Sequence, residues 1–495
     1  MNGQDALLGV DIGTSSSKAV LVGLDGQLLA LAVRPHVTST PSPGRFEQDA
    51  EWVWWADFVV LTRELLARCP NARVIALAAS GLGPCVLPTD ADNRALRPAI
   101  LYGIDTRAER QIGELEDLLG AGAILARSGN RLTSQAIGPK LMWLRDEEPD
   151  VWARTRRMYM AASYLVARLT GEYVLDHHSA SQAAPLYLLA ERRWNDSWCA
   201  ELAPQLELPR LAWPEEIVGA LTPAAAAVTG LTAGTPVTCG TIDAWAEGIS
   251  VGATAVGDVM IMYGTTMFLT AVTDRALTSD RLWSTAGARR DTFTLAGGMA
   301  TSGAITDWFR RLTGTDYPEL AAAAAEVPAG SRGLLLLPYF AGERTPLFEP
   351  RARGVLAGLT LNSGPGEIYR AILEATAFGV RHNLEAFEAA GAITARFVAV
   401  GGGAGQELWP KIVSSVIGRA QQLTRETVGA ALGDAMLAAA AVGREPDLNQ
   451  WNPVVRKVEP DPESSVVYQD LWPHYRELHR QTRAIQSVLA GFNMS

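Results

Sequence analysis

Apolar and polar positions alternate in blocks at the start of the chain. Residues 7–10 and 19–24 are mainly apolar, and the block at 13–17 consists of glycine, threonine and serine. Apolar runs joined by small polar turns are typical of β-hairpins. Asp25-Gly26 then predicts a tight two-residue turn into a return strand over 28–33.

A weaker copy of this pattern lies in the second half of the chain. Residues 259–272 form two apolar runs around Gly264-Thr265-Thr266. An ordinary polar turn is an alternative explanation for either copy alone. Together, the two copies predict two related halves, each of which begins with a polar-turned hairpin.

Between and after the hairpins, helical and strand patterns alternate. Helices are expected at 51–69, 107–119, 139–145, 162–169, 305–312, 365–390, 408–417, 430–442 and 472–489, strands at 74–79, 236–240, 334–339 and 397–400, mixed structure at 176–195, and a surface loop at 446–462. A chain of 495 residues is too long for one hydrophobic core. We therefore expect an α/β protein with two domains, 1–245 and 246–495, on either side of a cleft.

Composition narrows the class of protein. The net charge is −10 and no basic cluster is present, which argues against a nucleic-acid surface. No apolar run reaches the roughly 18 residues of a membrane span, and the first residues lack a signal-peptide pattern. The four cysteines stand alone, without CxxC spacing, which is typical of reduced thiols in a cytoplasm. These features predict a cytoplasmic enzyme.

The first polar turn has the chemistry of a phosphate site. Thr14, Lys18 and the backbone N–H groups are donors, and Asp11 at the end of the first strand is an acceptor. Donors around a carboxylate suit a nucleotide polyphosphate with its Mg²⁺. The turn therefore predicts a nucleotide site.

Asp243 is a candidate general base. It follows an apolar strand and begins a helix, where a fixed carboxylate can accept the proton of an attacking hydroxyl. A helix N-cap is the alternative role. The glycines at 401–403 end another strand, where they allow either close approach to a ligand or a tight connection. Neither a Rossmann nor a P-loop motif is present.

Seven segments, in order, resemble the FGGY carbohydrate kinases, a family on the sugar-kinase, actin and heat-shock ATPase scaffold. They are 11–18, 46–55, 105–107, 240–248, 264–266, 337–346 and 401–404. The resemblance covers nearly the whole chain. It implies two related domains of the actin-like ATPase (ribonuclease H-like) fold and ATP-dependent transfer of phosphate to a sugar or polyol.

The resemblance also implies roles for individual residues. Asp243 is the base and contacts the acceptor, and Asp11 organises Mg²⁺ through water. The implied phosphate and nucleotide residues are Thr14, Lys18, Gly264, Thr265, Thr266, Gly303, Gly403 and Glu407. For Glu343 and Arg344, a structural ion pair near the hinge is favoured over a direct role in catalysis.

Among the branches of the family, the chain is most similar to xylulokinases, with two departures. The segment 80–85 replaces the usual Gln-Met-His that contacts sugar, and Ala244 replaces an Asn. Both changes remove polar groups that would face the sugar. Because buried polar partners discriminate between sugars, the identity of the sugar stays open. Arg107 and Trp245 are candidate acceptor contacts, with a plain core role as the alternative for Trp245.

The expected partners are therefore ATP and a small sugar or polyol, with no nucleic acid and no membrane. D-xylulose is the leading acceptor. Ribulose, glycerol and erythritol-like polyols stay open, as do a degenerate sugar-sensing protein, an ATP-binding switch and a homodimer.

Overall fold

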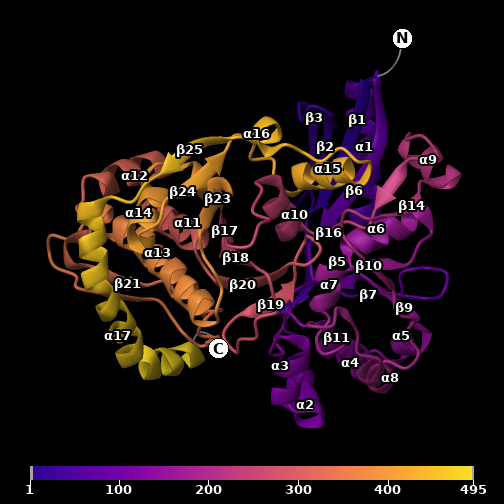
Figure 1. Ribbon diagram of the computed structural model, residues 1–495. Coiled ribbons are helices and arrows are strands. Elements are labelled where there is room, and N and C mark those ends of the chain that lie inside the picture. Colours follow the sequence, from indigo (N-terminus) through magenta and orange to yellow (C-terminus); the bar gives the residue numbers. More distant parts are fainter. Residues whose placement is uncertain (1–3, 493–495) are drawn as a thin grey trace.

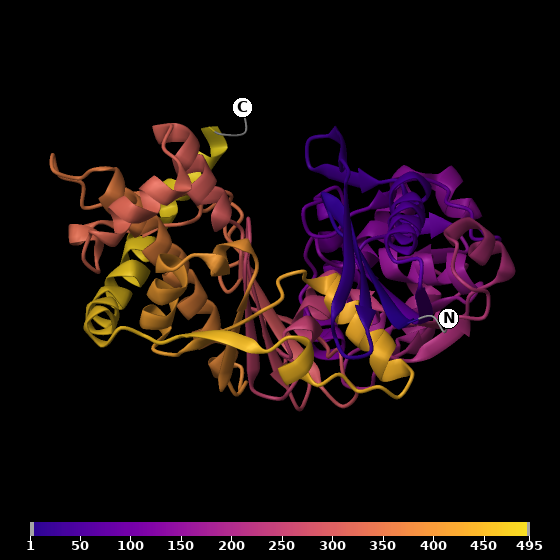
Figure 2. The same ribbon diagram turned by 90° about the horizontal axis from the view of Figure 1, so that it is seen from above.

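The computed structural model describes residues 4–492, in which two seven-stranded mixed sheets form the centres of two lobes (Figures 1 and 2). In spatial order, the first sheet contains β14 (Ile217–Ala220), β15 (Pro236–Thr238), β6 (Ala72–Gly81), β1 (Gln4–Ile12), β2 (Ser16–Gly23) and β3 (Leu28–Pro35), with β16 (Thr241–Ile242) also paired to β6. The second contains β19 (Trp283–Ala286), β20 (Phe293–Met299), β18 (Met267–Thr273), β17 (Asp258–Tyr263), β23 (Arg396–Val400), β24 (Gln421–Thr424) and β25 (Val454–Val458).

The two sheets share one pairing scheme. In the first, β1, β2 and β3 pair antiparallel, β6 joins β1 in parallel, β15 joins β6 in parallel, and β14 closes antiparallel. In the second, β17, β18 and β20 pair antiparallel, β23 joins β17 in parallel, β24 joins β23 in parallel, and β25 closes antiparallel. The predicted relationship between the halves is confirmed.

Both faces of β1 are covered, which explains its nearly continuous apolar sequence. Leu8 and Val10 pack with α1 (Ala56–Arg68) in one cluster, whereas Leu7 packs with α15 (Ala430–Ala441) in another. Alternate residues of a strand point to opposite faces, so this division follows from the strand period.

Helix α15 packs on the first sheet although it lies in the second half of the sequence (Figure 2). A Cβ on Gly9 of β1 would collide with the carbonyl oxygen of Ala431. A Cβ on Gly433 would collide with the carbonyl oxygen of Ala246 in α10 (Asp243–Ser250). Glycine therefore permits backbone contact between α15 and both neighbours. The domain division at 245/246 stays a prediction.

Other elements surround these sheets. The first lobe also has β4 (Ser39–Ser42), β5 (Arg45–Gln48), β7 (Leu87–Thr89), β8 (Ala99–Ile100), β9 (Arg157–Tyr159), β10 (Val174–Asp176), β11 (Tyr187–Leu188), β12 (Arg193–Trp194), β13 (Arg210–Ala212), the π-helix η1 (Ala50–Trp55), α2 (Glu109–Leu119), α3 (Ala121–Ser128), α4 (Ile137–Glu147), α5 (Pro149–Arg154), α6 (Ala161–Thr170), α7 (His177–Ser181), α8 (Asp196–Leu202) and α9 (Pro223–Thr229). The second has α11 (Gly303–Thr313), α12 (Tyr317–Ala325), the 3₁₀ turns η2 (Ser331–Gly333) and η3 (Gly402–Gly405), β21 (Leu335–Leu337), β22 (Val355–Ala357), α13 (Pro365–Ala389), α14 (Leu408–Ile417) and α17 (Pro462–Phe492). Helix α16 (Leu448–Trp451) packs with α15 against the first sheet.

Two expectations near the C-terminus are wrong. The predicted surface loop at 446–462 contains α16 and the edge strand β25, and Trp451 is buried against the cluster around α15. The last helix is also longer than the predicted 472–489, because α17 begins at Pro462 and continues through Pro473. Within residues 4–492, no helix has the length and apolarity needed to cross a bilayer.

Candidate functional site

Three parallel strands bring the candidate catalytic residues to one edge of the first sheet. Asp11 on β1 lies opposite Ser80 on β6, and Thr241 on β16 lies opposite Ser80 from the other side. Because the strands are parallel, their carboxyl ends coincide, and Asp243 follows directly after β16. The sheet thus brings Asp11 and Asp243 close enough for each charge to affect the other.

Asp11 lies in an environment rich in negative charge. Burial raises its pKa well above the ordinary value, and the charges of Asp243 and Glu247 raise it further. Lys18, opposite Asp11 in the β1–β2 hairpin, acts in the other direction. The Oδ1 atom of Asp11 is buried and has no hydrogen-bond partner within residues 4–492. An unsatisfied carboxylate oxygen beside further carboxylates fits a hydrated divalent cation.

Asp243 and Glu247 lie on successive turns of α10. Burial raises the pKa of Asp243 to about 6, an effect reduced by the N–H of Ala244, which donates to its Oδ1 at 2.7 Å. Burial raises the pKa of Glu247 to about 7. The charge of Lys18 lowers this pKa, and the charge of Asp243 raises it. The N-cap residue of α10 is Ile242, so Asp243 does not occupy the cap position proposed as the alternative.

Asp434 is a further buried carboxylate that sequence reasoning missed. It lies in the otherwise apolar helix α15 and is 0 % exposed. Its Oδ2 accepts hydrogen bonds from the N–H (3.1 Å) and the hydroxyl (2.7 Å) of Ser80. Burial raises its pKa well above normal, and Asp11 and Asp243 both add to the effect. The available signal was a single acidic residue within an alanine-rich helix.

The second polar turn is built from backbone contacts and hydroxyls. The N–H of Gly303 donates to the oxygen of Gly264 at 2.9 Å, and the N–H groups of Ser302 and Ala304 donate to the oxygen of Thr265. A Cβ on Gly303 would lie 2.6 Å from the oxygen of Gly264. Within the described residues, the hydroxyls of Thr265 and Thr266 have no protein partner, so both can bind a ligand.

The third glycine segment lies beside the second turn, because β23 pairs in parallel with β17. Gly401 has φ +88°, and a Cβ there would lie 2.6 Å from the oxygen of Tyr263. A Cβ on Gly403 would lie 2.7 Å from the Trp409 ring. Close packing therefore explains both glycines. Glu407 is exposed at the start of α14, without a side-chain capping bond.

Thr14 connects the first turn to the region that faces the second lobe. Its hydroxyl lies 3.1 Å from the hydroxyl of Tyr102. Burial raises the pKa of Tyr102, the charge of Asp243 raises it further, and Arg344 of the second lobe lowers it. Tyr102 thus lies within the electrostatic reach of both halves.

The expected ion pair between Glu343 and Arg344 is wrong. The backbone N–H of Arg344 donates to Oε1 of Glu343 at 2.7 Å, and the N–H of Ala300 donates to the same oxygen. The guanidinium of Arg344 makes no ion pair in the part of the chain that the structure describes, while burial lowers its pKa. Arg344 is therefore a cation with unused donors.

The two predicted acceptor contacts, Arg107 and Trp245, both have protein partners. Arg107 binds Asp105 through two nitrogens and Glu47 through a third. Trp245 is 8 % exposed, stacks on His178 with ring centroids 3.6 Å apart, and lies 5.8 Å from Phe268 of the second lobe. Trp245 thus packs between the two halves.

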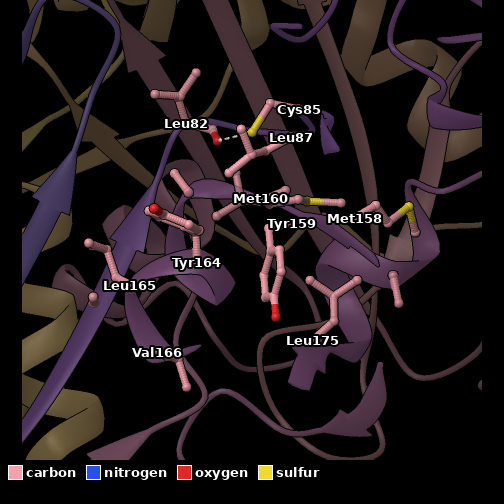
Figure 3. Packing of buried hydrophobic residues seen from close by; sticks show 14 of the residues in the cluster. Leu82, Cys85, Leu87, Met158, Tyr159, Met160, Tyr164, Leu165, Val166 and Leu175 are labelled. Atoms are coloured by element: carbon pink, nitrogen blue, oxygen red, sulfur yellow. Dashed lines mark hydrogen bonds between the residues drawn. The ribbon is translucent and has the colours of Figure 1, made fainter. Parts of the chain in front are cut away.

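The segment that replaces Gln-Met-His is part of the core. Leu82 and Cys85 are buried and pack among Leu87, Met160 and Tyr164, and the Cys85 thiol donates to the oxygen of Leu82 at 3.6 Å (Figure 3). These side chains therefore offer no polar group to a ligand, in agreement with the sequence.

Family models match both halves of the chain. The N-terminal domain of the FGGY family of carbohydrate kinases matches residues 6–249, and its C-terminal domain matches residues 259–442. Together with the duplicated sheets and the strand-end carboxylates, these matches define a two-domain sugar kinase of the actin-like ATPase fold. The chain belongs to the FGGY family of carbohydrate kinases.

Individual relatives support the same assignment. The xylulose kinase of Escherichia coli (strain K12) is 31% identical over 486 residues, which cover 96% of this chain and 98% of the relative. The glycerol kinase of Nocardia farcinica is 30% identical over 400 residues, 77% of each chain. The structure of xylulose kinase from Rhodospirillum rubrum superposes with a TM-score of 0.90 at 31% identity and covers 97% of this chain and 99% of that one.

Proposed function

We propose that this chain transfers the γ-phosphoryl group of ATP to a hydroxyl of a ketopentose, with xylulose the leading acceptor. Asp243 takes the proton of the acceptor hydroxyl as its oxygen forms a bond to the γ-phosphorus. The bond from that phosphorus to the bridging oxygen breaks, and ADP leaves. The observation that carries this proposal is the position of Asp243, a raised-pKa carboxylate at the same sheet edge as Asp11 and Lys18.

The remaining residues bind and neutralise the triphosphate. Thr14 and Lys18 of the first turn, and Thr265 and Thr266 of the second, donate to phosphate oxygens, while Gly303 keeps the phosphate path open. The unsatisfied oxygen of Asp11 suits a water of Mg²⁺. The cation, when bound, offsets charge on the transferring group. Gly403 and Glu407 border the nucleoside.

The choice of acceptor rests on the relatives and on the residues that replace the xylulokinase pattern. Xylulose is favoured because the relatives named xylulose kinase match over nearly their whole length. The apolar segment at 82–85 and Ala244 leave fewer polar groups for a sugar than the xylulokinase pattern has. Glycerol, ribulose and erythritol-like polyols are therefore the alternatives, as is a degenerate sugar sensor. Acceptor roles for Arg107 and Trp245 stay predictions.

An acceptor panel tests the proposal. ADP release would be measured with pentuloses, aldopentoses, pentitols, gluconate and glycerol, for the wild type, Asp243→Asn and the exposed control Asp117→Asn. We expect turnover with a ketopentose that falls by about 10²–10⁴-fold in Asp243→Asn, because a general base is lost. The Asp117→Asn variant should match the wild type.

Other results would redirect the proposal. Turnover only with glycerol or gluconate would overturn the ketopentose assignment and keep the kinase. Binding of a sugar without any turnover would identify a sensor. A turnover within about tenfold of the wild type in Asp243→Asn would remove Asp243 from its role.

A further inference from the structure

His36, which follows β3, is bonded to the first polar turn at two points. Its Nε2 lies 3.0 Å from the carbonyl oxygen of Gly13, and its backbone N–H donates to the carbonyl oxygen of Ser15 at 3.0 Å. A carbonyl oxygen can only accept, so Nε2 carries the proton of the first bond. The side chain of His36 is 8 % exposed, so the ring holds the turn from a buried position.

A buried aspartate fixes the His36 ring. Asp57 in the first turn of α1 is 1 % exposed, and its Oδ2 lies 2.8 Å from Nδ1 of His36. The same carboxylate accepts from the hydroxyl of Ser17 at 2.7 Å and pairs with Nε of Arg34 at 3.1 Å. A ring protonated on both nitrogens completes the bonds to Asp57 and to the turn. Asp57 therefore connects the ring to β2, the strand that leaves the turn.

Gln48 at the end of β5 holds the next carbonyl of the turn. Its Nε2 donates to the carbonyl oxygen of Thr14 at 3.0 Å, and the hydroxyl of Thr38 donates to the same oxygen at 2.6 Å. The indole N–H of Trp54 donates to Oε1 of Gln48 at 2.8 Å. Because an indole N–H can only donate, this bond fixes which end of the amide faces the turn. Gln48 is 2 % exposed and belongs to the segment 46–55, to which the proposed function assigns no role.

The N–H groups of the same peptide planes are left for a ligand. Those of Thr14 and Ser15 make no hydrogen bond with any residue that the structure describes. In a trans peptide the N–H points away from the C=O, so holding the carbonyls of Gly13 and Thr14 directs these N–H groups to the opposite side. Consecutive N–H groups of this kind form a concavity that binds anions. The open side of the turn is therefore preset for phosphate oxygens.

We propose that His36 and Gln48 are positioning residues that hold the first turn in the shape that binds the phosphates of the nucleotide. The inference rests on the proposed kinase function and adds two side chains that act from outside the turn. His36 acts through the carbonyl of Gly13, and Gln48 acts through that of Thr14. A turn whose donors are already ordered loses less conformational entropy when the nucleotide binds, which raises the affinity.

A pair of His36 variants separates the bond to the turn from the bond to Asp57. The amide nitrogen of glutamine is as many bonds from Cβ as Nε2 of histidine, and that of asparagine is as many as Nδ1. His36→Gln can therefore keep the bond to Gly13, whereas His36→Asn can keep only the bond to Asp57. We expect His36→Asn to raise the KM and the Kd for ATP by about three- to tenfold, the effect of one hydrogen bond, and His36→Gln to stay within about twofold of the wild type.

Gln48→Met removes the donor to Thr14 and keeps a side chain of similar length. The matched control is Gln486→Met in α17, where a buried glutamine also uses both ends of its amide in hydrogen bonds. Both variants should lower the Tm, because each deletes buried hydrogen bonds. Only Gln48→Met should also raise the Kd for ATP, by about three- to tenfold, and the KM for the acceptor should stay unchanged.

Calorimetric titration with ADP and with a non-hydrolysable ATP analogue measures binding without an acceptor, so the test does not depend on turnover. Equal effects of His36→Asn and His36→Gln on the Kd would overturn the inference, as would a lower Tm of Gln48→Met without a change in Kd. If the wild type binds nucleotide but phosphorylates no acceptor, the kinase proposal fails, and weaker binding by His36→Asn and Gln48→Met still supports the positioning role. If the wild type binds no nucleotide, both proposals fail.

Discussion

The two polar turns have the same backbone setting and different chemistry. Each connects an antiparallel hairpin, and each begins with a glycine whose N–H donates back across the turn, from Gly13 to Ser16 and from Gly264 to Thr266. Around the first turn lie Asp11, Lys18 and the carboxylates of α10 and α15. The second turn offers threonine hydroxyls and backbone groups.

This difference shows that duplication of a fold need not duplicate a site. The first turn combines a cation with buried carboxylates of raised pKa, a setting that suits proton transfer near neutral pH. The second, whose Gly264 and Thr265 oxygens are bonded to the start of α11, can hold oxygens without adding charge. We infer that the first half supplies the charged chemistry and the second half supplies neutral donors.

For the two turns, the largest expected effect on the KM for ATP is that of losing Lys18, the lysine of the first turn. Lys18→Met removes a charged donor to phosphate, and hydrogen bonds to charged groups contribute about 1.5–3 kcal/mol. We therefore expect the KM for ATP to rise about 10- to 100-fold, measured by initial rates at saturating acceptor. Lys457→Met, at an exposed lysine paired with Glu459, is the control. An unchanged KM for ATP in Lys18→Met would contradict the proposed difference between a charged first turn and a neutral second turn.

The next effect concerns pH and the carboxylates near the first turn. Because the pKa of Asp243 is about 6, kcat/KM should fall about tenfold per pH unit below that value as the base is protonated. A profile flat from pH 7 to 4.5 would contradict the assignment.

Stability should depend on pH through Glu247. Its folded pKa of about 7 exceeds the ordinary value of 4.5, so the folded state holds a proton that the unfolded state has lost. The free energy of unfolding should therefore fall as pH rises from 4.5 to 7. Glu247→Gln removes this contribution, so its Tm advantage over the wild type should be largest near pH 8 and absent near pH 4.5.

A smaller effect concerns packing at the second turn. The Cβ of Gly303→Ala would lie 2.6 Å from the oxygen of Gly264, and such overpacking costs about 1–3 kcal/mol. We expect a lower Tm together with a higher KM for ATP. Gly113→Ala, at an exposed helical glycine with open space, should instead leave the Tm unchanged or raise it slightly. Equal changes in Tm for Gly303→Ala and Gly113→Ala would mean that the second turn can shift to make room for the added methyl group.

The smallest effect is expected at the second turn itself. Thr265→Val removes one neutral hydroxyl, so the KM for ATP should rise about two- to tenfold, less than for Lys18→Met. Initial-rate measurements on both variants give the ratio directly. A larger effect for Thr265→Val than for Lys18→Met would reverse the assignment of charged and neutral roles.

Local patterns in the sequence were sufficient to predict the elements on which much of the candidate site lies. Both hairpins, the strand before Asp243 and the helix that it begins appear in the structure where the apolar runs end. Strand ends and polar turns are local features, so periodicity finds them. The family assignment likewise depended on short segments in a fixed order.

Features that depend on distant contacts were not visible. Ser80 and Asp434 are 354 residues apart, and nothing in either segment indicates the other. Strand β25 lies at a sheet edge and is mostly exposed, so its sequence VVRKV lacks a clear alternation. Its Arg456 nevertheless donates to the oxygens of Ala404 and Gln406. The contacts of Arg107 with Glu47 and of Trp245 with His178 were hidden for the same reason.

The position of α15 has a consequence for how the chain can be divided. Leu7, Val20, Val22, Ala76 and Ala78 of the first sheet are buried in the same cluster as this helix. A polypeptide truncated after residue 245 would leave that apolar surface facing water, and exposed strands of this kind aggregate. The amino-terminal lobe is thus completed only after ribosomes have synthesised nearly all of the carboxyl-terminal one.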